Sequence, residues 1–160
     1  MGNFVEPKSL AKTLRWKLFL LGFFKIPMLG KLRPKITCIN DEMVQVKIKL
    51  RRRSKNHLNS MYFGALAVGA DCCAGLHAFY FAEKHHRKIS FAFKSMDAQF
   101  IKRVETDAKF VFNNGKEIEA LVLKSIETGE RYNHPCTVEV FNESSELVAT
   151  FTMEASLKVV

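Results

Sequence analysis

One segment, from about residue 60 to residue 83, is apolar on nearly every side and most restricts what this chain can fold into. Its alanine, leucine and methionine side chains favour a helix, but no single amphipathic stripe can be assigned to it. Such a helix cannot be hidden by packing one face on a flat sheet. It needs a strongly curved sheet around it, or a sheet together with a second copy of the same helix in a dimer.

The same segment is long enough, at about 22 residues, for a transmembrane span. Asp71 lies near its middle, His77 follows, and three glycines interrupt it. Ionisable side chains are rare within spans, and the alternating segments that come next are typical of strands. We therefore expect a buried helix inside a folded domain.

Apolar and polar residues alternate on both sides of this helix, which is the period of half-buried strands. Residues 44–50 alternate, and residues 35–39 predict a preceding strand that turns at Asn40-Asp41. After the helix, the same pattern predicts strands at residues 89–93, 108–112, 118–122, 134–142 and 147–159.

No second clear helix is expected after residue 89. Residues 113–115, Asn-Asn-Gly, are typical of a β-hairpin turn, and Ile118, Ala120 and Val122 alternate after it. We expect four or five antiparallel strands in this half. The fold class is therefore α+β, with the helices on one side of one sheet.

The excess of basic over acidic residues lies in the N-terminal third of the chain. Residues 1–55 hold 14 Lys/Arg and 3 Asp/Glu, whereas residues 56–160 hold 11 and 13. A basic end favours polyanions: nucleic acid, an anionic membrane surface, or a phosphorylated small molecule such as coenzyme A. No helix-turn-helix, zinc-finger or RNA-binding pattern accompanies the charge, so no nucleic-acid partner is expected.

Residues 10–30 predict a basic amphipathic helix that ends near Ile26-Pro27. Two interpretations stay open: the helix lies on a membrane interface, or it packs across the domain or a subunit interface. The expected aromatic face and the cations that flank it comprise Trp16, Phe19, Phe23 and Phe24, with Lys12, Arg15 and Lys17.

The four cysteines form no C-x-x-C pair, so neither a zinc site nor a redox motif is predicted. No secretory signal is visible. We expect a cytoplasmic protein, with peripheral contact at the inner membrane surface if residues 10–30 bind there.

The start of the apolar helix carries a pattern that resembles a known family. In hotdog-fold thioesterases of the phenylacetate-pathway type, an Asn is followed six residues later by His-Gly-Gly and then by an acidic residue nine after the His. Here Asn56 stands at the Asn, Tyr62-Phe63-Gly64 stands at His-Gly-Gly, and Asp71 stands at the acidic position. The order of elements over about residues 34–157 is also similar to these enzymes and to uncharacterised bacterial relatives.

This resemblance implies a hotdog fold, in which a curved antiparallel sheet wraps around a long central helix. We divide the chain into a basic helical segment at residues 1–33 and a hotdog domain at residues 34–160. The resemblance further implies a homodimer with sites at its interface, and a tetramer remains an alternative.

The chemistry of thioester hydrolysis assigns roles to the matched residues. Donors must polarise the carbonyl, and a base or nucleophile must bring in water. Gly64 in the first helical turn is expected to supply an oxyanion donor, and Asp71, with its pKa raised by an apolar setting, the base or nucleophile. Asn56 and Tyr62 are expected to orient the substrate, and Phe63 to shape an acyl pocket. No metal or cofactor is required, since coenzyme A is part of the substrate.

The spacing of Gly64 and Asp71 predicts assembly. Seven residues are nearly two helical turns, so the two lie on about the same face but about 10 Å apart along the axis. They cannot contact one carbonyl carbon. Two antiparallel central helices would bring Gly64 of one chain to Asp71 of the other, forming two equivalent sites in a two-fold dimer.

A run of cations, Arg51, Arg52, Arg53 and Lys55, precedes the helix. Such a run is usually a solvated loop. Its place beside the expected site makes recognition of the coenzyme A phosphates the second interpretation, because arginine forks bind phosphate oxygens well.

The sequence therefore predicts an acyl-CoA thioesterase that releases a carboxylic acid and a free thiol. The alternative is a non-catalytic homodimer that binds acyl thioesters or lipids, because Tyr62 and Phe63 replace the family's His and first Gly. Asp71 is alternatively a carboxylate satisfied by hydrogen bonds, and Asn56 alternatively a helix cap or turn residue.

Overall fold

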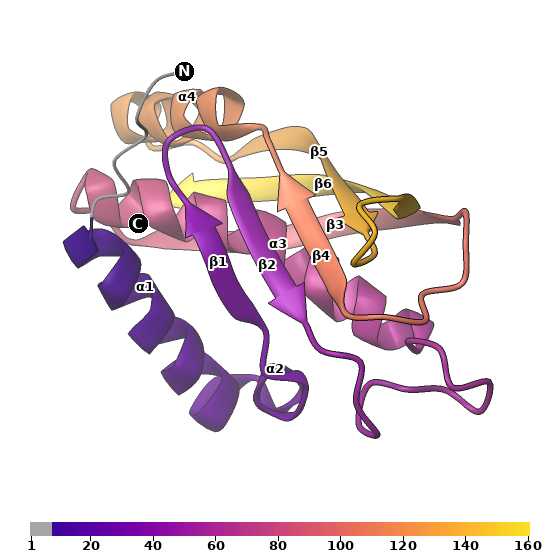
Figure 1. Ribbon diagram of the computed structural model, residues 1–160. Helices are drawn as coiled ribbons and strands as arrows, with labels where there is room; N and C mark the ends of the chain where they lie inside the picture. The colour runs from indigo at the N-terminus through magenta and orange to yellow at the C-terminus, as the bar shows by residue number, and fades with distance from the viewer. Residues whose placement is uncertain (1–7) are drawn as a thin grey trace, which may run out of the picture.

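The computed structural model describes residues 8–160, so the first seven residues of the expected segment 1–33 lie outside it. Helices and strands follow one another along the chain as Figure 1 labels them. They are α1 (Lys8–Leu20), a π-helical turn η1 (Leu21–Lys25), α2 (Pro27–Leu32), β1 (Lys35–Ile39), β2 (Val44–Ile48), α3 (Phe63–Lys84), β3 (Ile89–Phe100), β4 (Ala108–Phe112), α4 (Gly115–Thr128), β5 (Tyr132–Phe141) and β6 (Leu147–Val159).

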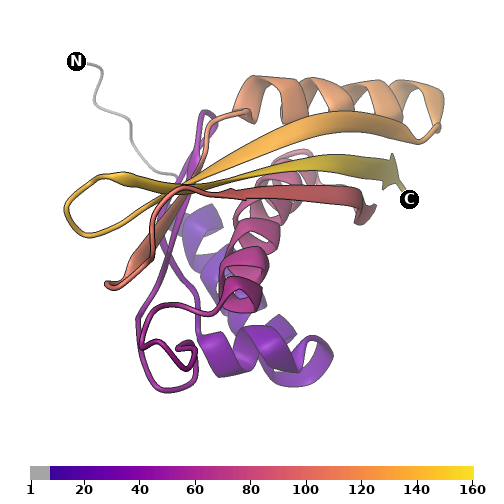
Figure 2. The ribbon, with the colours of Figure 1, turned by 90° about the vertical axis from the view of Figure 1, so that its right-hand side faces the viewer.

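The six strands form one antiparallel sheet in the order β1-β2-β4-β5-β6-β3. The long strands β3, β5 and β6 turn away from β1, β2 and β4, so that the sheet curves around α3 (Figures 1 and 2). Strand β3 pairs only with β6 and leaves its other edge unpaired within the described residues. The expected curved antiparallel sheet around an apolar helix is confirmed.

The apolar helix α3 spans 22 residues and packs against β2, β3, β4, β5 and β6. By length and composition it is the one described helix that could cross a membrane, but 78% of its most apolar window is buried inside the domain. Burial of that apolar area is the main stabilising term for such an element. The helix is therefore the core of the domain, as expected.

The inward faces of the strands complete this core with alternating residues, as the sequence predicts. The fully buried strand residues are Ile39, Val44, Val46, Ile48, Ala108, Phe110, Phe112, Val138, Val140, Val148, Ala149, Phe151, Ala155 and Leu157.

The N-terminal helices form a tight hairpin beneath α3 (Figure 2). Helix α1 packs on α3 and β1 through Ala11, Leu14 and Leu18, which are buried. The turn η1 and helix α2 cross at two glycines: a Cβ added at Gly30 would lie 2.4 Å from the Gly22 carbonyl oxygen. Backbone therefore touches backbone at this crossing, and a side chain at either glycine would not fit.

The predicted hairpin turn at residues 113–115 is wrong. These residues begin helix α4, and the segment expected as a strand at residues 118–122 is helical. Ile118, Val122 and Ser125 are buried on one face, a spacing of four and three residues that belongs to a helix. Ala120, which completed the apparent alternation, is exposed.

Tertiary contacts explain why Gly115 begins a helix. Its N–H donates to the Glu42 carbonyl, and a Cβ at this position would lie 2.0 Å from the Asp41 carbonyl oxygen. The helix ends at Gly129, which adopts the left-handed conformation that favours glycine. Helix α4 packs against β5 and β6, and Figure 2 shows it above these strands with α3 below them.

Candidate active site

The first turn of α3 offers two unused hydrogen-bond donors. Tyr62 is the N-terminal capping residue, in an extended conformation, and its side chain makes no cap hydrogen bond. Its carbonyl accepts from the N–H groups of Ala65 and Leu66. Within residues 8–160, the N–H groups of Phe63 and Gly64 meet no acceptor. The helix therefore presents two free N–H groups and its positive dipole end at this point.

The Tyr62 ring lies against the Gly64 backbone. A Cβ at Gly64 would stand 2.5 Å from the Tyr62 Cε1 atom, so glycine is needed there for the ring to occupy this position. The Phe63 ring packs beside Tyr62, with centroids 4.7 Å apart, and both side chains are exposed. Two aromatic rings therefore flank the free N–H groups.

Asp71 lies on the face of α3 that the sheet does not cover. Its side chain reaches solvent in the single chain, although most of α3 is buried. The apolar surroundings still remove part of the hydration of the carboxylate and raise its pKa above the ordinary value, as predicted. No hydrogen bond or ion pair to Asp71 forms within residues 8–160. The carboxylate is therefore free to act on a ligand.

Gly64 and Asp71 share this uncovered face but do not meet in one chain. The helix rise places them about 10 Å apart along its axis. Between them Val68 is half-buried, so the face is a shallow apolar stripe with the carboxylate at one end and the free N–H groups at the other.

Asn56 holds the loop before the helix. Its Oδ1 accepts hydrogen bonds from the N–H of Leu58 at 2.9 Å, the N–H of Ser60 at 3.2 Å and the Ser60 hydroxyl at 3.2 Å. Asn56 therefore acts as a turn residue, the alternative to orienting a substrate, and its carboxamide oxygen is taken up by these three hydrogen bonds. Asn56 orders the approach to α3 and, within this chain, does not point its oxygen at a substrate.

The cation-rich loop is ordered by a buried serine. The Ser54 hydroxyl donates to the Lys49 carbonyl at 2.8 Å and accepts from the Arg51 N–H at 2.9 Å. The side chains of Arg51, Arg52, Arg53 and Lys55 are exposed, and Arg53 donates to the Lys31 carbonyl. The structure thus holds a fixed loop with cations that face solvent next to the start of α3.

Strand β3 lies beside the open face of α3. The Phe91 ring contacts the helix where Gly75 leaves room, with Cε1 3.6 Å from a Cβ built on that glycine. Phe91 also packs on Phe79 and Phe93, at centroid distances of 6.2 and 5.0 Å. The outer residues of β3 are exposed or half-buried along the whole strand.

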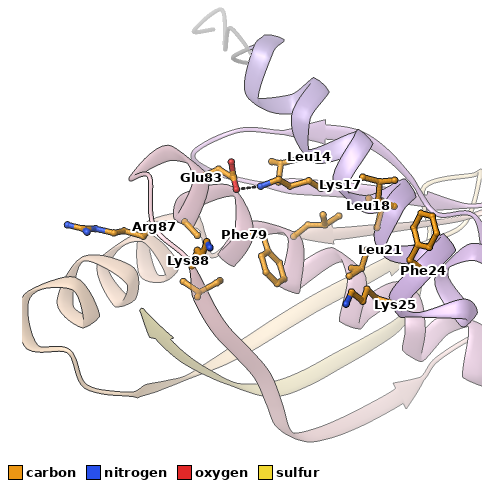
Figure 3. Close-up of a pocket in the computed structure, with 14 residues that line it drawn as sticks. Leu14, Lys17, Leu18, Leu21, Phe24, Lys25, Phe79, Glu83, Arg87 and Lys88 are labelled. Atoms are coloured by element: carbon orange, nitrogen blue, oxygen red, sulfur yellow. Dashed lines mark hydrogen bonds and ion pairs between the residues drawn. The ribbon is translucent and has the colours of Figure 1, made fainter. Parts of the chain in front are cut away.

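An apolar cavity of about 680 Å³ lies between α1, η1, the C-terminal half of α3 and the start of β3. Figure 3 shows Leu14, Leu18 and Leu21 on one wall and Phe79 on the facing wall. A cavity of this size and lining suits a small apolar ligand or an acyl chain.

Cations surround this cavity. Lys17 forms an ion pair with Glu83 across one side of it, drawn as a dashed line in Figure 3. Lys25, Arg87 and Lys88 also belong to its lining and form no ion pair within residues 8–160. An apolar interior with a basic rim is complementary to an amphiphile with an anionic head.

Sequence reasoning missed this cavity. The residues that build it come from two segments about 60 residues apart in the chain, 14–25 and 76–89, and only their packing creates the empty volume. One signal was present: Leu14, Leu18 and Leu21 recur at helical spacing along the predicted N-terminal helix.

The remaining ionisable core residues are structural. Burial raises the pKa of the Cys72 thiol to about 12, with the Asp71 charge adding to the shift, and raises that of Cys73 well above its ordinary value. Burial lowers the pKa of His77 to about 4, and its Nε2 lies 2.9 Å from the Asn40 carbonyl oxygen. Among residues 8–160, no group of three or more His, Cys, Asp or Glu side chains is arranged to hold a metal ion.

Comparison with known proteins agrees with this architecture. No curated protein matches the sequence. A solved structure from Shewanella oneidensis, for which thioesterase activity is proposed, is 12% identical and superposes with a TM-score of 0.79, covering 92% of this chain and 99% of that one.

Two further structures are similar over nearly the whole chain. A Pseudomonas aeruginosa protein, also proposed to be a thioesterase, is 20% identical with a TM-score of 0.70 and covers 99% of this chain and 100% of its own. A thioesterase from Haemophilus influenzae is 10% identical with a TM-score of 0.67, covering 91% and 90%. At these identities the likeness concerns the fold, which is the hotdog fold of thioesterases. The sequence profile of the family described as a domain of unknown function, DUF4442, matches residues 15–158, and the chain belongs to that family.

Proposed function

We propose that this protein is an acyl-thioester hydrolase that acts as a homodimer. One observation carries the proposal: the open face of α3 presents an unpaired carboxylate, Asp71, in line with the two free N–H groups of its first turn, Phe63 and Gly64. These are the two kinds of group that thioester hydrolysis needs, and one chain holds them too far apart to use together.

A two-fold dimer would join the two halves of the site. If two α3 helices lie side by side and antiparallel, Asp71 of one protomer faces Gly64 of the partner subunit. In that register the partner's helix begins opposite Cys72, so the C-terminal half of α3 and the apolar cavity beside it are not covered by that helix. The unpaired outer edge of β3 offers the second contact, because two such edges can pair and join the sheets.

The proposed reaction uses these groups directly. Asp71 accepts a proton from water as the water oxygen bonds to the thioester carbonyl carbon. The N–H groups of Phe63 and Gly64 stabilise the negative charge that forms on the carbonyl oxygen. The carbon–sulfur bond then breaks, the leaving sulfur takes the proton, and a carboxylic acid and a free thiol are released. Direct attack by the Asp71 carboxylate is the alternative first step.

The two ends of the substrate have separate places in this proposal. The acyl chain runs from Asp71 along α3 into the cavity; Phe79 is about 12 Å further along the helix, a span of about ten extended carbons. The exposed Arg51, Arg52, Arg53 and Lys55 bind the phosphates of coenzyme A. No metal or other cofactor takes part.

Thiol release from a panel of short, long and aromatic acyl-CoAs tests the proposal. The wild type is expected to turn over at least one class, and Asp71→Asn to lose about 10²- to 10⁴-fold of that rate, because the amide cannot accept the proton. Glu127→Gln, which neutralises an exposed carboxylate on α4, is the matched control and is expected to keep full activity. Unchanged turnover in Asp71→Asn would remove Asp71 from the mechanism.

A second function is favoured by one contact. The Tyr62 ring lies against the Gly64 backbone and narrows access to the free N–H groups. A homodimer that binds acyl thioesters without hydrolysing them fits this restriction. Acyl-CoA binding measured by calorimetry, with no thiol release over the same panel, would support this function; Tyr62→Gly would then be expected to open the site.

A further inference from the structure

The hairpin of α1, η1 and α2 presents an apolar face that no part of residues 8–160 covers. The larger side chains on this face are between 40% and 71% exposed. We call it the aromatic face; it consists of Trp16, Phe19, Phe23, Phe24, Ile26 and Met28.

The rings on this face form one continuous surface. Trp16 stacks on Phe19 with centroids 5.6 Å apart, Phe19 stacks on Phe23 at 6.3 Å, and Phe23 meets Phe24 edge-on at 4.8 Å. Exposed contiguous apolar patches are uncommon on proteins without a binding partner, and they mark interaction sites. Scattered exposure of single residues does not explain this face.

The way α1 packs on the domain explains why the aromatic face is exposed. Helix α1 is attached to the core through Ala11, Leu14 and Leu18, so its aromatic side points outward by construction. The contact between Gly22 and Gly30 then holds the tip of the hairpin at a set angle. The packing interpretation of residues 10–30 therefore applies to the leucine side, and the aromatic face still needs an occupant.

The charges around the aromatic face indicate what kind of partner would bind there. Residues 8–33 contain seven Lys or Arg and no Asp or Glu. Lys25 directly follows Phe24, and Lys12 lies about one helical turn before Trp16; both side chains are exposed. Aromatic side chains flanked by cations suit the boundary between lipid headgroups and acyl chains, with the basic groups at the level of the phosphates.

We propose that the aromatic face docks the protein on an anionic lipid bilayer, with the rings in the interface and the cations on the lipid phosphates. This inference does not depend on the proposed hydrolysis, because it uses neither Asp71 nor the dimer contact. It has one consequence for ligand access: Phe24 and Lys25 also line the apolar cavity, so the cavity lies beside the docked surface (Figure 3).

The chain contains one tryptophan, and it lies on this face, so its fluorescence reports docking directly. Full-length protein is titrated with vesicles of neutral phosphatidylcholine and with vesicles that contain one third phosphatidylglycerol. We expect a blue shift of Trp16 emission and co-sedimentation with the anionic vesicles, about tenfold weaker binding to the neutral ones, and weakening of the anionic binding by salt.

Two variants test the two parts of the face while keeping Trp16. The double variant Phe19→Ser/Phe23→Ser is expected to lose vesicle binding by at least about tenfold through lost apolar burial, and Lys12→Glu by about tenfold through charge. The matched controls lie on α4: Leu123→Ser removes another exposed apolar side chain, and Lys116→Glu reverses another exposed cation. Both controls should bind as the wild type does.

Circular dichroism should show all four variants folded, because the altered side chains are exposed. An unshifted Trp16 emission and no co-sedimentation with anionic vesicles would overturn the proposal. A Trp16 emission that is already blue without lipid and that varies with protein concentration would also overturn it, by assigning the face to a second copy of the chain. Loss of vesicle binding in the α4 controls equal to the loss in the two test variants would also overturn the proposal.

Discussion

The Phe110 ring lies directly over Gly69, with its Cζ atom only 2.2 Å from where a Cβ on that glycine would be. The absence of a side chain at Gly69 thus lets α3 approach strand β4 closely. Gly75, in the same helix, faces the half-buried Phe91 ring at an ordinary van der Waals distance of 3.6 Å.

These two glycines predict opposite effects of the same substitution. Gly69→Ala should lower the free energy of unfolding by about 1–3 kcal/mol, because the buried ring must move in a packed core. Gly75→Ala should leave the free energy of unfolding unchanged or raise it by up to about 1 kcal/mol, because alanine is the better helix former. Urea unfolding of both variants measures the difference; equal stabilities would contradict the packing described here.

The buried His77 predicts a pH dependence of stability. Its pKa falls to about 4 in the folded protein, whereas an unfolded histidine titrates near 6.5. Below pH 6.5 the unfolded chain therefore binds the proton first, and stability is lost as the pH falls from 6.5 towards 4. The loss expected from this residue is about 3 kcal/mol.

Denaturant unfolding at pH 7, 5.5 and 4 measures that loss, and the difference between wild type and His77→Gln isolates it from the carboxylates. His77→Gln should be less stable at pH 7, since its packing on Phe81 is lost, but should show a shallower decline with pH. Parallel pH curves for the two proteins would show that His77 does not titrate as described.

The apolar cavity predicts a dependence on acyl length. Leu21→Trp adds bulk to its wall and should weaken binding or turnover of the longest acyl chains by about tenfold while sparing short ones. The ratio of kcat/KM, or of Kd if there is no turnover, across a series of acyl-CoAs gives the result. Leu123→Trp, outside the cavity, serves as control; equal effects on all chain lengths would place the acyl chain elsewhere.

The open edge of β3 predicts the behaviour of a dimer. Met96 is 42% exposed on that strand, and Met96→Asp would bring two like charges together where two edges pair. We expect a shift from dimer to monomer in analytical ultracentrifugation and loss of thiol release in the same protein. Leu123→Asp on α4 should remain dimeric and active. A wild-type protein that is monomeric at micromolar concentration would contradict the shared site.

The order of elements around α3 could be predicted because alternation and continuous apolarity are local signals. The buried residues of β2 lie where that alternation puts them. Strands β4 and β6 follow it in part, because Val111, Val148 and Ser156 on their other face are buried as well. Helix α4 could not be predicted in this way. Ile118 and Val122 fit both a strand and a helix at a spacing of four, and the contact of Gly115 with the carbonyls of Asp41 and Glu42 decided between them.

The candidate site was predicted in part. The spacing along α3 correctly placed Gly64 and Asp71 on one face and excluded their use together in one chain. It did not show that this face is open, that the Tyr62 ring lies against Gly64, or that Asn56 uses its amide oxygen to hold its own loop. Each of these depends on side-chain orientation, which a one-dimensional pattern does not contain.

Local residue patterns by themselves determined that a long apolar helix must be wrapped by strands, that its first turn and one carboxylate share a face, and that the basic charge gathers at the N-terminal end. Only the tertiary structure decided which side of α1 is buried, and that a cavity forms between α1 and α3. The physical reason is that periodicity identifies a face, whereas its exposure depends on which distant elements pack against it.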